Sequence, residues 1–206
     1  MWKPVALVAC VLLASCGGKA AAPERISTPP DWRTVATDAD RARLRSWRDA
    51  WVAALGRVRA AGQGAQLAPE GALFDPDRAL PGALPAAGDY RCRVFKLGAK
   101  GTAAAEFRTY PWFDCRIDSE GEVLSLYKDS GAQRPVGLIF RDGDARAIFL
   151  GTMMLGDERS PLQYGQDATR DMAGVVERIG ERHWRVALPY PAFESVLDVI
   201  ELVPAK

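Results

Sequence analysis

The chain has 206 residues, of which 48% are hydrophobic and 26% charged, and its 27 basic side chains nearly balance 26 acidic ones. A nucleic-acid-binding domain normally presents a basic face, so this balance argues against that class. The same balance gives no reason to expect electrostatic capture by anionic lipids. The single histidine excludes a multi-histidine metal site and a histidine-rich proton relay.

The first residues have the features of a bacterial lipoprotein signal. Lys3 gives a basic start, residues 4–13 form an uncharged run too short to span a bilayer as a mature helix, and residues 13–16 read Leu-Ala-Ser-Cys. This tetrapeptide resembles the lipobox, in which the cysteine is lipidated and becomes the first residue of the mature protein. We therefore expect residues 1–15 to be a signal peptide and Cys16 to carry the lipid. An ordinary cleaved signal with a chance cysteine, or a short uncleaved anchor, is the alternative.

The expected lipid on Cys16 also bears on location. Gly17 is not the aspartate that retains lipoproteins in the inner membrane of enteric bacteria, so the resemblance favours the outer membrane over the inner membrane, facing the periplasm. We expect residues 16–36 to comprise the lipidated cysteine and a small, polar, proline-punctuated tether. Such a tether lets the folded part stand clear of the membrane surface.

An amphipathic helix is predicted over residues 37–61. Thr37 followed by Asp40 three positions later is a helix start signal. Apolar side chains then recur at spacings of three and four residues and form one stripe: Leu44, Trp47, Trp51, Leu55 and Val58. We expect the two tryptophans to pack the helix onto the main domain, with a partner-facing role as the alternative. Residues 62–87 are rich in glycine, alanine and proline and form a connector.

Short apolar or alternating runs separated by turn residues fill the chain from residue 88 to 206. They cover residues 90–97, 112–117, 122–127, 136–140, 145–150, 172–179, 183–188 and 196–203. Asp142-Gly143 between two of them is a strong hairpin signal. About eight strands with tight turns predict a mainly β fold with an N-terminal helix (α+β). We expect a small antiparallel, meander-like β-barrel similar to lipocalins, with a β-sandwich as the alternative.

A disulfide is predicted between Cys92 and Cys115. Each cysteine lies on the apolar face of an alternating segment, and exported proteins occupy an oxidising compartment. Closing a loop of about 24 residues contributes roughly 3 kcal/mol in the chain-entropy model. The spacing is not Cys-x-x-Cys, so a structural bridge is favoured over a redox role.

The densest polar cluster lies between two predicted strands, over residues 128–135. Lys128, Ser130, Gln133 and Arg134 are the candidate residues for binding a ligand or a partner, since such a rim loop can hold a carboxylate or phosphate group. A solvated hairpin turn is the alternative. No serine-hydrolase, P-loop or dinucleotide motif is present, so we predict no catalytic residue, no cofactor and no metal.

Aromatic residues occur on or beside most of the predicted strands. They are Tyr90, Phe95, Trp112, Phe113, Tyr127, Phe140, Phe149 and Trp184. In a small barrel we expect such side chains to fill the interior. The alternative is that they line a cavity for an apolar ligand, since eight-stranded barrels can hold one small molecule.

Four segments together resemble a known family. They are residues 88–94 (GDYRCRV), 110–115 (YPWFDC), 130–135 (SGAQRP) and 177–180 (ERIG). They are similar to an uncharacterised proteobacterial lipoprotein family known by its domain of unknown function 4893. The resemblance covers residues 31–204 and implies no activity, cofactor or catalytic residue. At the level of fold alone, the chain is also similar to lipocalin-like exported barrels.

Three functions are compatible with these features. The first is a lipid-anchored, non-catalytic binding module of the cell envelope for a small apolar or amphipathic ligand. The second is a protein-interaction or protease-inhibitor-like module, with an envelope protein as partner. The third, least favoured because of the missing motifs, is a hydrolase. The expected partners are the membrane, through Cys16, and a small ligand or envelope protein, but not nucleic acid.

Overall fold

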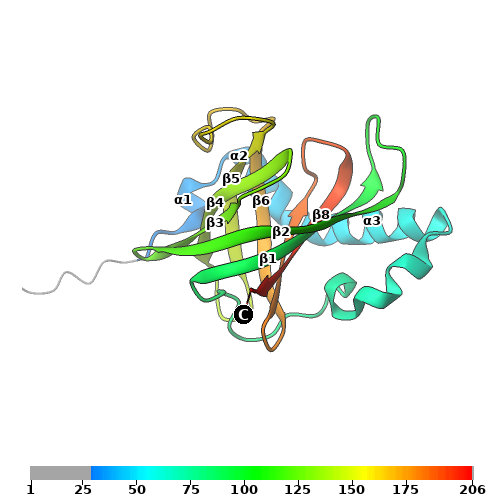
Figure 1. Ribbon diagram of the computed structural model, residues 1–206, viewed down its shortest axis with the longest axis horizontal. Coiled ribbons are helices and arrows are strands. Elements are labelled where there is room, and N and C mark those ends of the chain that lie inside the picture. The colour runs from blue at the N-terminus through cyan, green and yellow to red at the C-terminus, as the bar shows by residue number, and fades with distance from the viewer. Residues whose placement is uncertain (1–28, 206) are drawn as a thin grey trace, which may run out of the picture.

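The computed structural model describes residues 29–205, which form a closed eight-stranded antiparallel barrel with short helices on the N-terminal side (Figure 1). The predicted barrel is therefore confirmed, and the alternative sandwich is wrong. The expected signal peptide, Cys16 and the tether as far as residue 28 lie outside the described residues. Within residues 29–205, no helix is long and apolar enough to cross a membrane.

The barrel is a simple meander in which each strand pairs with the next and the last pairs with the first. The strands are β1 (Gly88–Ala99), β2 (Phe107–Glu120), β3 (Val123–Lys128), β4 (Gln133–Arg141), β5 (Ala147–Leu155), β6 (Asp171–Gly180), β7 (His183–Pro189) and β8 (Ser195–Pro204). All eight predicted segments are strands, and several extend further than their apolar pattern indicates. Full closure leaves no unpaired sheet edge.

Strand β2 begins at Phe107 and runs through Pro111, whereas the predicted strand begins only at residue 112. Arg93 of β1 faces Trp112 and Phe95 faces Thr109, so two residues of β2 lie opposite one residue of β1. This is a β-bulge, which tolerates a proline because the ladder is already interrupted there. The bulge therefore interrupts the ladder without ending the strand.

The helical segment consists of three α-helices followed by two short 3-10 helices. They are α1 (Trp32–Val35), α2 (Asp38–Arg45), α3 (Trp47–Ala60), η1 (Gly64–Gln66) and η2 (Ala68–Phe74). Thr37 caps α2 by accepting a hydrogen bond from the Asp40 amide, as its sequence pattern indicates. The stretch expected to form one helix over residues 37–61 is divided at Ser46 into α2 and α3.

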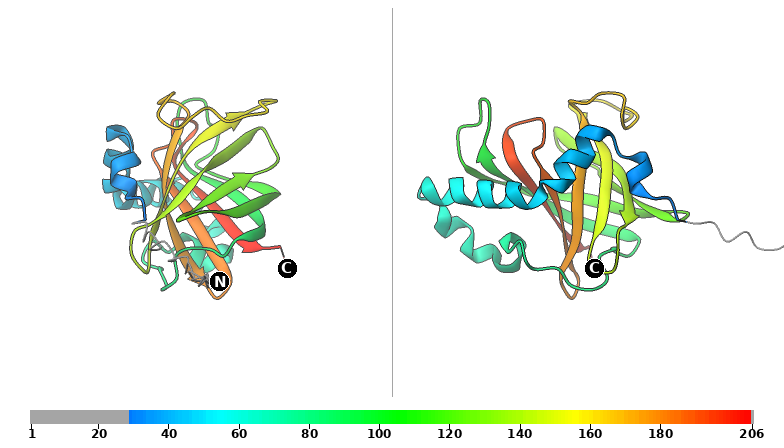
Figure 2. Two further views of the ribbon diagram at one scale, coloured as in Figure 1. Left: turned by 90° about the vertical axis from the view of Figure 1, so that its left-hand side faces the viewer. Right: turned by 180° about the vertical axis from the view of Figure 1, so that it is seen from behind.

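The helices lie along the outside of the barrel (Figure 2). Trp51 and Ala54 of α3 are fully buried against Phe95 and Leu197 on the outer face of β1 and β8. A second outer cluster packs α1 and α2 against β4, β5 and β6. Strands covered on both faces bury both sets of side chains, which explains the near-continuous apolar runs of β5 to β8.

The aromatic side chains divide between the two surfaces of the barrel wall. Four belong to the interior cluster: Tyr90, Phe113, Phe149 and Trp184. The other four lie on the outer surface: Phe95 and Phe140 beneath helices, and Trp112 and Tyr127 against arginine side chains. The expectation that the strand aromatics fill the interior is therefore wrong for half of them. Phe95 and Phe140 are buried because helices cover them on the outer surface of the barrel.

One end of the barrel is closed by the connector that precedes β1. Trp184 donates a hydrogen bond to the Gly82 carbonyl at 3.4 Å, and the Tyr90 hydroxyl donates to the Ala86 carbonyl at 2.9 Å. The disulfide between Cys92 and Cys115 lies in the same interior cluster, with its Cα atoms 5.8 Å apart. The predicted disulfide is thus confirmed.

Candidate functional site

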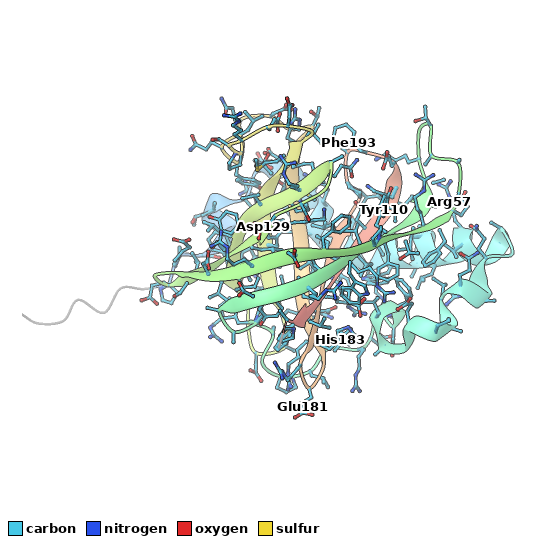
Figure 3. The ribbon with its side chains drawn as sticks, viewed as in Figure 1. Arg57, Tyr110, Asp129, Glu181, His183 and Phe193 are labelled. Carbon is cyan, nitrogen blue, oxygen red and sulfur yellow. A yellow bond between two sulfur atoms is a disulfide. The ribbon has the colours of Figure 1, made fainter. Side chains whose placement is uncertain are left out.

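A cavity of about 230 Å³ opens at the opposite end of the barrel. Its apolar wall includes Val94, Phe113, Met153, Met172, Leu188 and Ile200. These residues lie near the C-terminal ends of the odd-numbered strands or near the N-terminal ends of the even-numbered strands. Because neighbouring strands are antiparallel, these strand ends lie at the same end of the barrel. Figure 3 shows this end near Phe193 in the β7–β8 loop, and the closed end near Glu181 in the β6–β7 turn.

Two buried lysines lie in the cavity wall and have different surroundings. Lys96 Nζ is 3.2 Å from Asp198 Oδ2 and 3.2 Å from Glu194 Oε2. The Ser195 hydroxyl also donates to Asp198. Burial lowers the pKa of Lys96, but the two carboxylates outweigh burial and leave that pKa above its usual value. Lys96 is therefore a fully compensated cation.

Lys128 is the second lysine, with only 4% of its surface exposed. Its ammonium lies 3.5 Å from the centre of the Phe113 ring and donates to the carbonyls of Gln133, at 3.0 Å, and Ser130. Among residues 29–205, no carboxylate comes within 4 Å of it. Burial, helped by the positive charge of Arg134, lowers the pKa of Lys128 to about 8.

Gly131 allows the loop between β3 and β4 to close over Lys128. It has a φ of +91°, in the left-handed region that favours glycine. A Cβ atom there would lie 2.7 Å from Lys128 Nζ and 3.0 Å from Phe113 Cε1. The ammonium is thus held in one place by the loop, the ring and the two carbonyls.

The four candidate residues of this loop take different positions. Lys128 and Gln133 line the cavity, whereas Ser130 contributes its backbone carbonyl to Lys128. Arg134 donates to three backbone carbonyls, including those of Gly156 at 2.6 Å and Glu158 at 2.7 Å. Arg134 therefore ties the β3–β4 loop to the β5–β6 loop.

Lys96 and Asp198 are cavity residues that the sequence interpretation missed. Lys96 continues the alternation of Cys92 and Val94 and so falls on the apolar face of its strand. Asp198 similarly interrupts the apolar segment that ends the chain. A charged side chain on an apolar face was the available signal, because such groups are buried only when they are paired.

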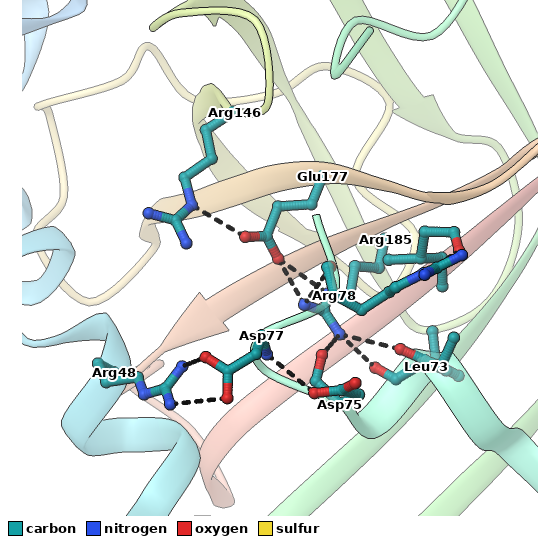
Figure 4. Close-up of polar contacts among 10 residues, drawn as sticks. Arg48, Leu73, Asp75, Asp77, Arg78, Arg146, Glu177 and Arg185 are labelled. Carbon is teal, nitrogen blue, oxygen red and sulfur yellow. Dashed lines mark hydrogen bonds and ion pairs between the residues drawn. The ribbon is translucent and has the colours of Figure 1, made fainter. Parts of the chain in front are cut away.

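A second buried ion pair lies outside the barrel wall and has a packing role (Figure 4). Arg185 and Glu177 are both fully buried and approach to 2.7 Å. Arg185 also donates to the carbonyls of Leu73, at 2.9 Å, and Asp75, at 2.7 Å. Burial lowers the pKa of Arg185 below its usual value, although the negative charge of Glu177 acts to raise it. This network fixes the connector to β6 and β7.

His183 belongs to a polar network on the outer surface. Its Nε2 atom lies 2.8 Å from Glu201 Oε1, and Arg93 donates to the other oxygen of Glu201 at 2.7 Å. Burial raises the pKa of Glu201, but the hydrogen bonds from His183 and Arg93 outweigh it and lower that pKa below its usual value. Because Arg93 also binds Glu70, the network links η2 to the barrel.

These observations define the class of protein as an up-and-down β-barrel with one covered end and a cavity at the other. The chain matches the model of DUF4893, a domain of unknown function, over residues 32–202, and it belongs to this family. No curated protein and no solved structure matches the chain. Across residues 29–205, no group of three or more histidine, cysteine, aspartate or glutamate side chains could hold a metal ion.

Proposed function

We propose that the protein is a lipid-anchored binding module of the bacterial envelope, which holds a small apolar or amphipathic ligand in the barrel. The cavity at the open end of the barrel is the observation that supports this proposal. It combines an apolar wall, an opening at one end and two buried lysines at fixed positions. Small-molecule sites in proteins have this composition: mostly apolar, with a few placed polar groups.

The size of the cavity supports a small ligand. Its volume is about 230 Å³. A dry apolar cavity of about 150 Å³ is sufficient for benzene. A short acyl chain or a substituted ring therefore fits, and a longer chain would extend through the open end.

The anchoring part of the proposal has independent support. Residues 13–16 resemble the lipobox. Because the basic and acidic side chains nearly balance, a lipid on Cys16 would be what attaches the chain to the membrane. The buried bridge between Cys92 and Cys115 fits an oxidising compartment such as the periplasm. We propose the outer membrane as the site of anchoring, because Gly17 is not the inner-membrane retention signal.

Purification of the full chain from its own envelope tests the binding proposal. Native mass spectrometry and solvent extraction should reveal a co-purifying small molecule. Met172→Trp, which fills the cavity, should lose it, whereas Leu138→Trp should retain it because Leu138 is 37% exposed and does not line the cavity. Equal loss or equal retention in the two variants would contradict the proposal.

Labelling with radioactive palmitate tests the anchoring proposal separately. The wild-type chain should incorporate the label and fractionate with outer membranes. Cys16→Ser should incorporate none, because the side chain that accepts the lipid is then absent. Equal labelling of both chains would show that Cys16 is not the lipidated residue.

A further inference from the structure

We infer that the ligand carries a single carboxylate, which pairs with the Lys128 ammonium while its apolar part fills the cavity beside Met153 and Met172. This inference rests on the proposed function and specifies the chemical class of the ligand. It follows from the difference between the two lysines of the cavity, from the contacts of Lys128 and from the charges on the β1–β8 side of the cavity.

Among residues 29–205, Lys128 contributes a positive charge without a carboxylate partner to the cavity wall, and its ammonium is in contact with the Phe113 ring and two carbonyls. The carbonyls are those of Ser130 and Gln133. Both acceptors are neutral, so within this part of the chain the charge of Lys128 has no counter-ion. Buried charges in proteins are normally paired, and a ligand carboxylate would supply the missing partner.

The carboxylates on the β1–β8 side of the cavity limit the ligand to one negative charge. Lys96 already contacts two carboxylates, those of Asp198 and Glu194. A second anionic group in a cavity of this size would approach these carboxylates and be repelled. The remaining wall is apolar, so the rest of the ligand should be apolar too.

Lys128 is also held in a fixed position. The loop closes tightly at Gly131, where a Cβ atom would come within 2.7 Å of the ammonium. The centre of the Phe113 ring lies 3.5 Å from the ammonium. A positioned donor loses little conformational entropy when the ligand binds, which favours recognition of the carboxylate.

Titration of the purified full chain with octanoate and 1-octanol tests the inference, since the two probes share a chain and differ in charge. By calorimetry, the wild-type protein should bind octanoate at least tenfold more tightly than 1-octanol. Lys128→Met should lose this preference while keeping its affinity for 1-octanol. Lys100→Met, which removes an exposed lysine, should behave like the wild type.

The outcomes separate the two proposals. If neither probe binds to the wild-type protein, the proposed function fails and this inference fails with it. If 1-octanol binds as tightly as octanoate, or if Lys128→Met keeps the preference, only the inference is overturned. Loss of both probes in Lys128→Met would make Lys128 a packing residue and would also overturn it.

A pH titration of the wild-type protein provides a test that needs no variant. The protonated fraction of a lysine with a pKa of about 8 falls about tenfold between pH 7 and pH 9. Octanoate affinity should fall by the same factor, and 1-octanol affinity should stay constant. Among residues 29–205, the other charged or titratable groups that line the cavity are Lys96, Asp198, Glu194 and Tyr110, and Arg134 also acts on the pKa of Lys128. A flat octanoate profile would overturn the inference.

Discussion

Lys96 and Asp198 lie directly opposite each other in the β1–β8 ladder, and their side chains form an ion pair of 3.2 Å inside the barrel. This ladder joins the first strand to the last, so the pair lies at the seam where the barrel closes. The same side chains form part of the cavity wall. One ion pair therefore both joins the two strands that close the barrel and contributes charged groups to the proposed site.

Removing one partner of this pair should be strongly destabilising. Lys96→Met leaves Asp198 buried without its main counter-ion, and we expect a loss of about 3–5 kcal/mol in the free energy of unfolding. The double variant Lys96→Met/Asp198→Leu should recover much of this loss, because it removes both buried charges. Urea denaturation measures both values. A single variant as stable as the wild type would show that the pair is dispensable.

The disulfide should contribute a separate share of stability. Replacing both Cys92 and Cys115 by alanine should lower the free energy of unfolding by about 2–5 kcal/mol, because the bridge restricts the unfolded chain. A reducing agent should lower the melting temperature of the wild-type protein. The same agent should not affect the double variant, which serves as its control. An unchanged wild-type melting temperature under complete reduction would contradict this prediction.

The Arg185–Glu177 pair should hold the connector in place. Among residues 29–205, Arg185→Met leaves the fully buried Glu177 with Arg146 as its one remaining ion-pair partner, and we expect a loss of about 3–5 kcal/mol in the free energy of unfolding. Hydrogen exchange at residues 72–78 should accelerate as the connector loosens. Arg48→Ala breaks a largely exposed pair with Asp77 and should leave the free energy of unfolding nearly unchanged, because solvent screens exposed ion pairs. Similar effects of the two variants would contradict the assigned roles.

Lys128 should make the free energy of unfolding depend on pH in the alkaline range. Its pKa of about 8 in the folded protein lies below the value of about 10.4 expected in the unfolded chain. Between these values the unfolded chain binds more protons, so the contribution of Lys128 to the free energy of unfolding rises with pH. Relative to Lys128→Met, the wild-type protein should gain about 2 kcal/mol between pH 8 and pH 10.4. A constant difference would show that the pKa of Lys128 is unperturbed.

The strands were predictable because apolar alternation and turn residues act locally. The division of the helix at Ser46 was not predictable in the same way, since Leu44 and Trp51 belong to one helical stripe. In the structure they pack on different parts of the barrel, Leu44 in the cluster beside β6 and Trp51 in the cluster beside β1 and β8. Tertiary packing on the curved barrel wall therefore determines that the helical stretch is divided at Ser46.

The candidate site was predictable only in part. Lys128 and Gln133 belong to a polar segment between two strands, which a single sequence reveals. Lys96 and Asp198 are 102 positions apart and come together only through the closing ladder. Before the register is known, each is an isolated charge on an apolar face. Their pairing is therefore a property of the closed barrel that local patterns do not contain.

The methionine methyl groups test the central claim, that the open end of the barrel binds a small apolar molecule, most directly. Met153 and Met172 line the cavity, whereas Met154 does not line it and follows Met153 on the opposite face of β5. In a methyl NMR titration with octanoate, the resonances of Met153 and Met172 should shift and saturate while that of Met154 stays in place. Unchanged resonances of Met153 and Met172 at millimolar octanoate would contradict the account.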